Sequence, residues 1–190
     1  RFAAANAIGF LINFGAFGQL FLLSLFLQQA RGADALHTGL QLLPVMAVFS
    51  IGNLLSGRIT AHWGARLPML GGLLLAALLA ALLTGMRPHT SYPLFALAVA
   101  IANWGVGIAV PAMTTTVMQI AGRSHANSAA AALNANRQIG ALVGVAIIGS
   151  ILHAAPSWEI RIPLAFGAIG LAYGAAALLV GRYITSPAKA

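Results

Sequence analysis

Cysteine and acidic residues are what this sequence of 190 residues has least of. Cysteine is absent, which excludes disulfide bonds and thiolate metal sites. The only acidic residues are Asp34 and Glu159, against ten basic ones, and charged residues make up 6% of the chain. An ordinary soluble domain has about 25%. With 60% hydrophobic residues and a mean hydropathy of +0.91, the sequence predicts an integral membrane protein.

Long apolar runs account for this composition. There are six, each close to the roughly 20 residues that a helix needs to cross the hydrocarbon core at about 1.5 Å per residue. Open sheet edges are not tolerated in lipid, and the runs are about twice the length of a barrel strand. We therefore expect one all-α domain of six transmembrane helices over residues 1–190. The predicted spans are 4–27, 40–59, 67–86, 94–113, 129–152 and 162–180.

The basic residues predict the orientation. Arg58 and Arg66 lie in the polar segment Ser56–Pro68 between the second and third spans, which the positive-inside tendency places in the cytoplasm. Alternation then puts both chain ends in the cytoplasm, with basic residues Arg1, Arg58, Arg66, Arg123, Arg182 and Lys189 inside and Arg31, Arg87 and Arg161 outside. Basic residues scattered singly in this way do not predict nucleic-acid binding. Because the chain opens on an arginine and not a methionine, we interpret it as a fragment.

Polar residues divide the spans into two triplets. In chain order the spans are polar, intermediate and plain, then polar, polar and plain. An unpaired amide that faces lipid costs several kcal/mol, so the third and sixth spans tolerate lipid best, while the first, fourth and fifth are expected to face protein or water. Two triplets of matching character are typical of an inverted three-plus-three repeat.

Arg137 is the sharpest candidate for function. The apolar run that follows it is too short to cross the membrane unless the segment 134–138 enters the inner half of the bilayer. An arginine there is costly and by default faces a cavity or a partner group. The alternative is that Arg137 extends to the inner headgroups or bonds helix carbonyls. Gly140 and Gly144 would let a neighbouring helix pack beside it.

Amides on two other spans are candidate cavity walls. Asn6 and Asn13 are seven residues apart and share a helix face with Gly9, while Asn103 and Pro111 align on the fourth span. Pro111 removes one backbone hydrogen bond and predicts a kink there. Each amide is equally compatible with tying one helix to another. Trp104, beside Asn103, has the chemistry to stack on an aromatic or cationic substrate, or to pack in the bundle.

Catalytic and metal-binding patterns are absent from the sequence. Ser150 and His153 lie one turn apart but have no orienting carboxylate, and no carboxylate lies within any span. The five histidines are too dispersed for a metal site. We expect no enzyme activity and no cofactor.

The segment Gly57–Arg66, G-R-I-T-A-H-W-G-A-R, resembles the loop motif G-x-L-x-D-R-x-G-R-K of the major facilitator superfamily. Ala61 stands where the motif has an aspartate that caps a helix and joins a charge network. The resemblance therefore implies that this half lacks that latch. The candidate motif residues are Gly57, Arg58, Gly64 and Arg66.

Three further stretches, 25–32, 38–44 and 136–146, are similar to the carboxy-terminal half of EmrB/QacA-type drug:proton antiporters, which have fourteen helices. In that fold the first and fourth helices of a half line the cavity, the second and fifth form the seam between halves, and the third and sixth support from outside. The resemblance implies that Asn6, Asn13, Asn103 and Trp104 face substrate and that Asn134, Arg137 and Gln138 act at the seam.

The sequence thus favours half of a secondary transporter in the bacterial inner membrane. It would export hydrophobic or cationic small molecules by rocking of two six-helix bundles, with protons carried by the amino-terminal half that this chain lacks. Two alternatives stay open: a membrane scaffold or subunit that transports nothing, and a family member that takes up a small organic solute.

Overall fold

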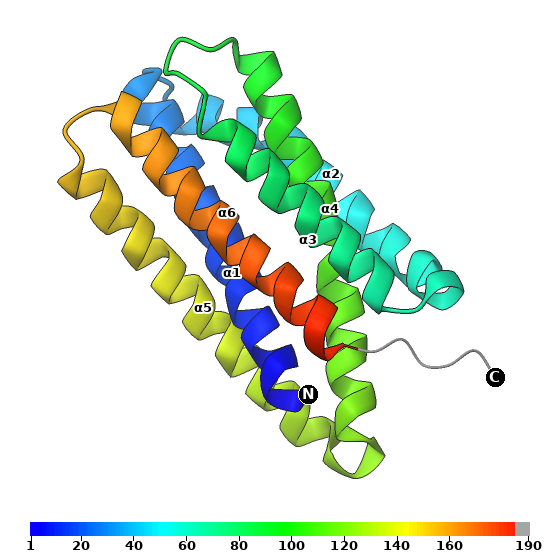
Figure 1. Ribbon diagram of the computed structural model, residues 1–190. Coiled ribbons are helices and arrows are strands. Elements are labelled where there is room, and N and C mark those ends of the chain that lie inside the picture. Colours follow the sequence, from blue (N-terminus) through cyan, green and yellow to red (C-terminus); the bar gives the residue numbers. More distant parts are fainter. Residues whose placement is uncertain (185–190) are drawn as a thin grey trace.

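The computed structural model describes residues 1–184, which form a bundle of six long helices without a strand (Figure 1). The helices are α1 Phe2–Leu25, continued by the π-helical turn η1 Phe26–Ala30, then α2 Ala35–Trp63, α3 Arg66–Leu83, α4 Tyr92–Ala121, the 3-10 turn η2 Arg123–His125, α5 Ala126–Ala154 and α6 Trp158–Tyr183. All six are long and apolar enough to cross a membrane. The predicted all-α, six-helix fold class is confirmed. Lys189 lies outside the described residues.

The helices end where the local sequence stops them. Asp34 caps α2, because its side chain accepts a hydrogen bond from the backbone N–H of His37 at 2.8 Å. Gly64 and Gly122 end α2 and α4 with φ of +73°, which other residues rarely adopt. No residue before Gly64 breaks the helix, so the polar segment Ser56–Pro68 is mostly helical. Only Gly64 and Ala65 separate α2 from α3.

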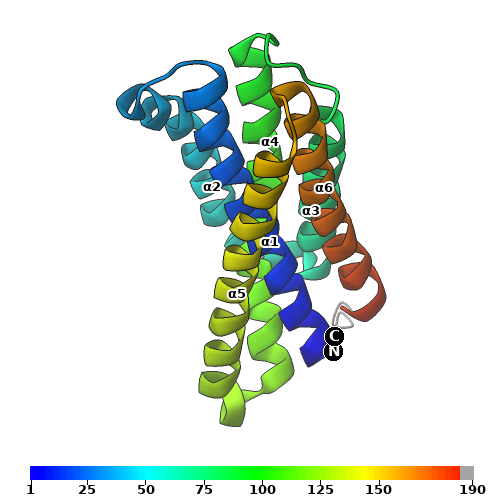
Figure 2. The ribbon, with the colours of Figure 1, turned by 90° about the vertical axis from the view of Figure 1, so that its left-hand side faces the viewer.

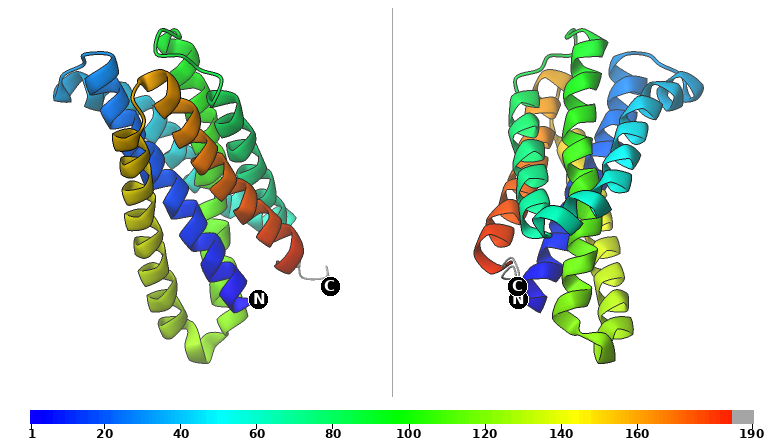
Figure 3. Two further views of the ribbon diagram at one scale, coloured as in Figure 1. Left: turned by 60° about the vertical axis from the view of Figure 1, so that its left-hand side comes forward. Right: turned by 90° about the vertical axis from the view of Figure 1, so that its right-hand side faces the viewer.

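Helix pairing follows the predicted repeat. We call the end of the bundle that holds the amino terminus and the α2–α3 and α4–α5 turns the inner end, following the predicted orientation, and the opposite end the outer end (Figures 1 and 3). The most extensive contacts join α1 to α5 and α6, α4 to α2 and α3, and α3 to α6. Exchanging the first three helices with the last three maps this set of contacts onto itself. An inverted three-plus-three repeat predicts this symmetry.

Glycines let the main helix pairs approach closely. A Cβ added at Gly140 or Gly144 of α5 would lie 2.3 Å from the carbonyl oxygen of Phe10 or Phe14 on α1. The α4–α2 crossing uses the same device, since a Cβ at Gly107 would lie 2.4 Å from a backbone oxygen of α2. Only glycine permits such close contact, as the sequence had indicated for Gly140 and Gly144.

Burial differs sharply among the helices. In α1 and α4, 56% of the most apolar stretch is buried, against 17% in α2 and 22% in α5. The third and sixth helices, expected to tolerate lipid best, are intermediate at 39% and 44% because they pack on each other. Figure 2 shows α2 diverging from the rest of the bundle at the outer end. The two helices left most exposed, α2 and α5, are therefore those that the family resemblance assigns to the seam.

Candidate functional site

Arg137 lies where α5 crosses α1 near the inner end. Its Cγ lies 3.5 Å from the position that a Cβ would take at Gly9 of α1. Leu133 Cδ1 and Met113 Sδ approach the same point to 2.9 and 3.1 Å, so three helices meet over this glycine. The Arg137 side chain is half-buried. Gly9 thus leaves the space that Leu133 and Met113 fill, and the stem of Arg137 packs beside them.

The guanidinium group of Arg137 is not satisfied by its surroundings. Its Nε is buried and has no hydrogen-bond partner in the part of the chain that the structure describes. Arginine at the centre of a membrane helix costs about 2.5 to 3.5 kcal/mol on insertion scales. A buried N–H without an acceptor is costly, so either a partner from outside the described residues accepts from it or a ligand does.

Amides of α1 and α5 lie on the turns next to the point where Arg137 approaches Gly9. Asn136 Nδ2 donates to the carbonyl oxygen of Asn6 at 2.9 Å, which ties α5 to α1. Asn6 and Asn13 are both buried, and their Nδ2 atoms donate to carbonyl oxygens one turn earlier on α1, those of Phe2 at 3.1 Å and Gly9 at 2.9 Å. Asn6 and Asn13 therefore lie one turn to either side of Gly9, which Arg137 approaches, and their amide N–H groups are bonded to backbone.

Asn103 and Trp104 are neighbours in sequence but point in different directions. Asn103 is buried, and its Nδ2 donates to the carbonyl oxygen of Val99 at 2.9 Å. Trp104 instead lines a groove of about 350 Å³ with residues of α2 and α3, among them Trp63 and Gly71. Since consecutive helical residues are about 100° apart, the two side chains do not share one surface. Trp104 lies away from Arg137.

Asn134 and Gln138 flank Arg137 on α5 and are both exposed. The exposed surface of α5 around them also carries Ile139 and Leu142. This mixture of amides and large apolar side chains on the least buried helices leaves room for a packing partner. The seam assignment of Asn134, Arg137 and Gln138 stays a prediction.

The α2–α3 turn divides the candidate motif residues by role. Arg66 donates from Nη2 to the carbonyl oxygen of Gly181 at 2.8 Å and so links the start of α3 to the last turn of α6. A cation at a helix carboxyl end is favoured by the helix dipole. Gly64 supplies the positive φ of the turn, whereas Gly57 and Arg58 are exposed on α2. In this structure Arg66, directly after the turn, connects α3 to α6.

Pro111 lies inside α4, which continues to Ala121 without interruption. Because proline has no backbone N–H, the carbonyl oxygen of Gly107 loses its usual helical partner. Gly107 is also where α4 contacts α2 most closely. The predicted kink stays a prediction.

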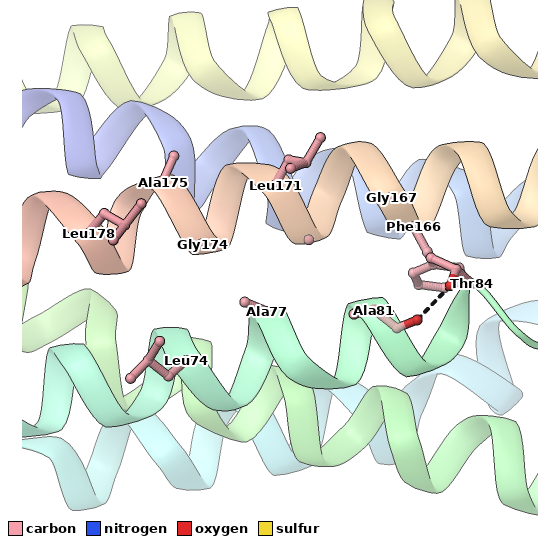
Figure 4. A pocket seen from close by; sticks show the side chains of 11 residues that line it. Leu74, Ala77, Ala81, Thr84, Phe166, Gly167, Leu171, Gly174, Ala175 and Leu178 are labelled. Atoms are coloured by element: carbon pink, nitrogen blue, oxygen red, sulfur yellow. Dashed lines mark hydrogen bonds between the residues drawn. The ribbon is translucent and has the colours of Figure 1, made fainter.

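A groove between α3 and α6 is a poor candidate for the polar site. It has a volume of about 670 Å³ and is shown in Figure 4. Its one polar side chain, Thr84, donates its hydroxyl hydrogen to the carbonyl oxygen of Ala81 on its own helix at 2.6 Å. A groove lined almost wholly by Leu, Ala, Gly and Phe offers no group that would orient a polar ligand.

Sequence reasoning missed several residues that shape the site. Gly9 was noticed only as a neighbour of Asn6 and Asn13, and Met113 and Leu133 carried no signal because apolar residues fill every span. Ser56 is buried and donates to the carbonyl oxygen of Ile108 at 2.7 Å, joining α2 to α4. A buried hydroxyl in an apolar span is the signal that would have identified Ser56.

Known proteins that resemble this chain carry names of drug resistance. It is 49% identical over 187 residues to the "Methylenomycin A resistance protein" of Bacillus subtilis and 40% identical over 188 residues to the protein of that name from Streptomyces coelicolor. The matches cover 98% and 99% of this chain but 40% of each relative. A third relative is the "Multidrug resistance protein Stp" of Mycobacterium tuberculosis, 33% identical over 153 residues, which are 80% of this chain and 28% of that protein.

The family profile described as "Major Facilitator Superfamily" matches residues 5–190. That range covers all six helices apart from the first three residues of α1. Together with the exchange symmetry of the helix contacts, the match gives the family of this integral membrane protein. The chain belongs to the Major Facilitator Superfamily.

Proposed function

We propose that this chain is the carboxy-terminal half of an exporter that removes small organic molecules from the cell. The observation that carries the proposal is the similarity, over 98% and 99% of the chain, to two proteins named for methylenomycin A resistance. The matched part is 40% of each relative, which leaves room for a second half. The exposed faces of α2 and α5 support the same conclusion, since they offer a surface on which that half would pack.

The proposed mechanism is alternating access. Two bundles that rock about their shared seam would open a midplane site alternately to either side. Coupling to protons would depend on the rest of the protein, because this chain has only two acidic residues and both lie at the outer end of the bundle. The chain supplies binding and packing surfaces, and no chemical reaction is assigned to it.

The proposed location is the bacterial inner membrane with the inner end in the cytoplasm. The α2–α3 and α4–α5 turns, which carry Arg66 and Arg123, lie at the same end of the bundle (Figure 3). This arrangement agrees with the positive-inside tendency. Reporter fusions after Tyr183 and after Ala154 of the full-length protein would report cytoplasmic and external positions respectively if the proposal holds.

A susceptibility experiment tests export. The full-length protein is expressed in a strain that lacks its own drug pumps, and growth is measured across a panel that includes methylenomycin A, tetracycline and cationic dyes. The proposal predicts a higher inhibitory concentration and lower cellular accumulation for at least one compound. Unchanged growth and accumulation for every compound, with the protein present in the membrane, would contradict it.

A further inference from the structure

The charges inside this bundle are unbalanced. Arg137 lies within α5, whereas Asp34 precedes α2 and Glu159 lies in the first turn of α6, both at the outer end. From Arg137 the helix runs on for 17 residues to Ala154. At 1.5 Å per residue, the outer end lies about 25 Å away. No acidic side chain of this chain reaches Arg137.

Neutral groups of the chain do not satisfy the arginine either. Its Nε is buried without an acceptor in the described part of the chain. Asn6, Asn13 and Asn136 lie on the neighbouring turns of α1 and α5, and in the described part of the chain none of them accepts a hydrogen bond from Arg137. A guanidinium is a rigid planar donor that matches the two oxygens of a carboxylate. A carboxylate therefore fits the missing partner of Arg137.

The packing of Arg137 holds this donor in place. The side-chain stem lies against Gly9, where Leu133 and Met113 also converge. A stem packed in this way loses less freedom when the guanidinium binds a ligand. The half-buried state leaves part of the side chain accessible.

We propose that Arg137 binds a carboxylate that comes from outside this chain, and that the transported molecule carries it. The substrate class would then be a small organic acid in its ionised form. This inference rests on the proposed export function. It replaces the preference for cations drawn from the family resemblance, because this half offers a cation no acidic partner within its spans. An acidic residue elsewhere in the full-length protein is the second source of the same chemistry.

The test compares an acid with its neutral amide. Binding of 1-naphthylacetate and 1-naphthylacetamide to the purified full-length protein is measured by titration calorimetry. The wild type is expected to bind the acid at least about tenfold more tightly than the amide. Arg137→Gln should abolish that preference and leave the affinity for the amide within about twofold, while Arg137→Lys should retain part of it. Gel filtration confirms that each variant is folded.

Arg123→Gln is the matched control. It removes the same charge from the exposed turn η2 outside the spans, so the preference for the acid should persist. Equal binding of acid and amide by the wild type, no binding of either, or an undiminished preference in Arg137→Gln would each overturn the proposal for the substrate.

The two sources of the carboxylate give different patterns. If the protein itself supplies it, Arg137→Gln lowers the melting temperature and weakens both probes alike, and changing the responsible acidic residue to its amide restores the melting temperature. That result would keep Arg137 as a carboxylate site but overturn the substrate as its source. A protein that confers no resistance yet shows the Arg137-dependent preference would contradict export and leave the binding site standing.

Discussion

The α1–α5 crossing and the α4–α2 crossing are equivalent under exchange of the two triplets, yet they differ in their polar groups. Both bring helix backbones together at glycine, through Gly144 in one and Gly107 in the other. At the α4–α2 crossing the buried polar side chain Ser56 has a backbone acceptor. At the α1–α5 crossing the buried Nε of Arg137 has no acceptor among residues 1–184. The repeat thus reuses one packing device. Since α2 also holds a buried polar atom without a partner in that range, Thr60 Oγ1, what distinguishes the α1–α5 crossing is that its unpaired group belongs to a cation.

The largest expected effect comes from a methyl group added where α1 and α5 are in closest contact. In Gly144→Ala the new Cβ would lie 2.3 Å from the backbone oxygen of Phe14, which cannot move without shifting α1. We expect a loss of about 2 kcal/mol in the free energy of unfolding of the full-length protein, measured by denaturation in detergent. Gly149→Ala on the same helix is the control, because its Cβ would make only an ordinary contact with the Phe21 ring. Equal stability of the two variants would contradict the packing.

Gly107→Ala tests whether the other crossing is built in the same way. Its Cβ would lie 2.4 Å from the backbone oxygen of Phe49 on α2. The expected loss is again about 2 kcal/mol or slightly less. Gly57→Ala, which meets nothing within 4 Å, should be neutral or slightly stabilising, since alanine favours helix over glycine. A neutral Gly107→Ala would break the equivalence of the two crossings.

Ser56→Ala measures the satisfied polar group of the α4–α2 crossing. It removes the buried hydrogen bond to the carbonyl oxygen of Ile108. We expect a loss of about 1 kcal/mol in the same unfolding measurement. The control, Ser50→Ala, removes an exposed hydrogen bond to Met46 within one helix and should change little. If Ser50→Ala lowers the free energy of unfolding as much as Ser56→Ala, the hydrogen bond between α2 and α4 adds no stability beyond that of a bond within one helix.

The smallest expected effect concerns the start of α2, which follows α1, and the equivalent start of α5, which follows α4. The backbone N–H of His37, and then its side chain, hold the pKa of Asp34 below its usual value. The cap therefore stabilises α2 above the usual carboxyl pKa of about 3.9 and is lost as pH falls through the lowered value. The equivalent start of α5 has no side-chain cap. Amide exchange in the first turn of α2, but not of α5, should rise below about pH 4 after correction for the intrinsic rate. Parallel behaviour of the two turns would contradict this cap.

The fold was largely predictable because membrane helices leave a strong signal. Each apolar run had to be a helix, and the alternation of polar and plain spans indicated the repeat. The polar segment Ser56–Pro68, predicted to separate the second and third spans, is helical in its first part, because Arg58 and His62 belong to α2, which ends before Gly64. Burial was harder to predict. The sequence does not show that α3 and α6 pack on each other, while α2 and α5 keep an uncovered face.

The site was predictable only in part. Arg137 was found because an intramembrane cation is rare. The family resemblance assigns both Asn103 and Trp104 to the substrate side, whereas in the structure Asn103 is bonded to its own helix and Trp104 lines the groove beside α2 and α3. Gly9, on which the stem of Arg137 lies, carries no distinctive signal among 21 glycines. Contacts between helices distant in sequence are what single residues fail to predict.

Transport by the full-length protein tests the account most directly. Inverted membrane vesicles that contain the protein are energised so that protons are pumped into their lumen. Uptake of the compound to which the protein confers resistance is then followed over time. The account predicts proton-dependent accumulation in these vesicles that an uncoupler abolishes and that Arg137→Gln reduces, while Arg123→Gln does not. Uptake equal to that of vesicles without the protein would contradict the assignment of this chain to an exporter.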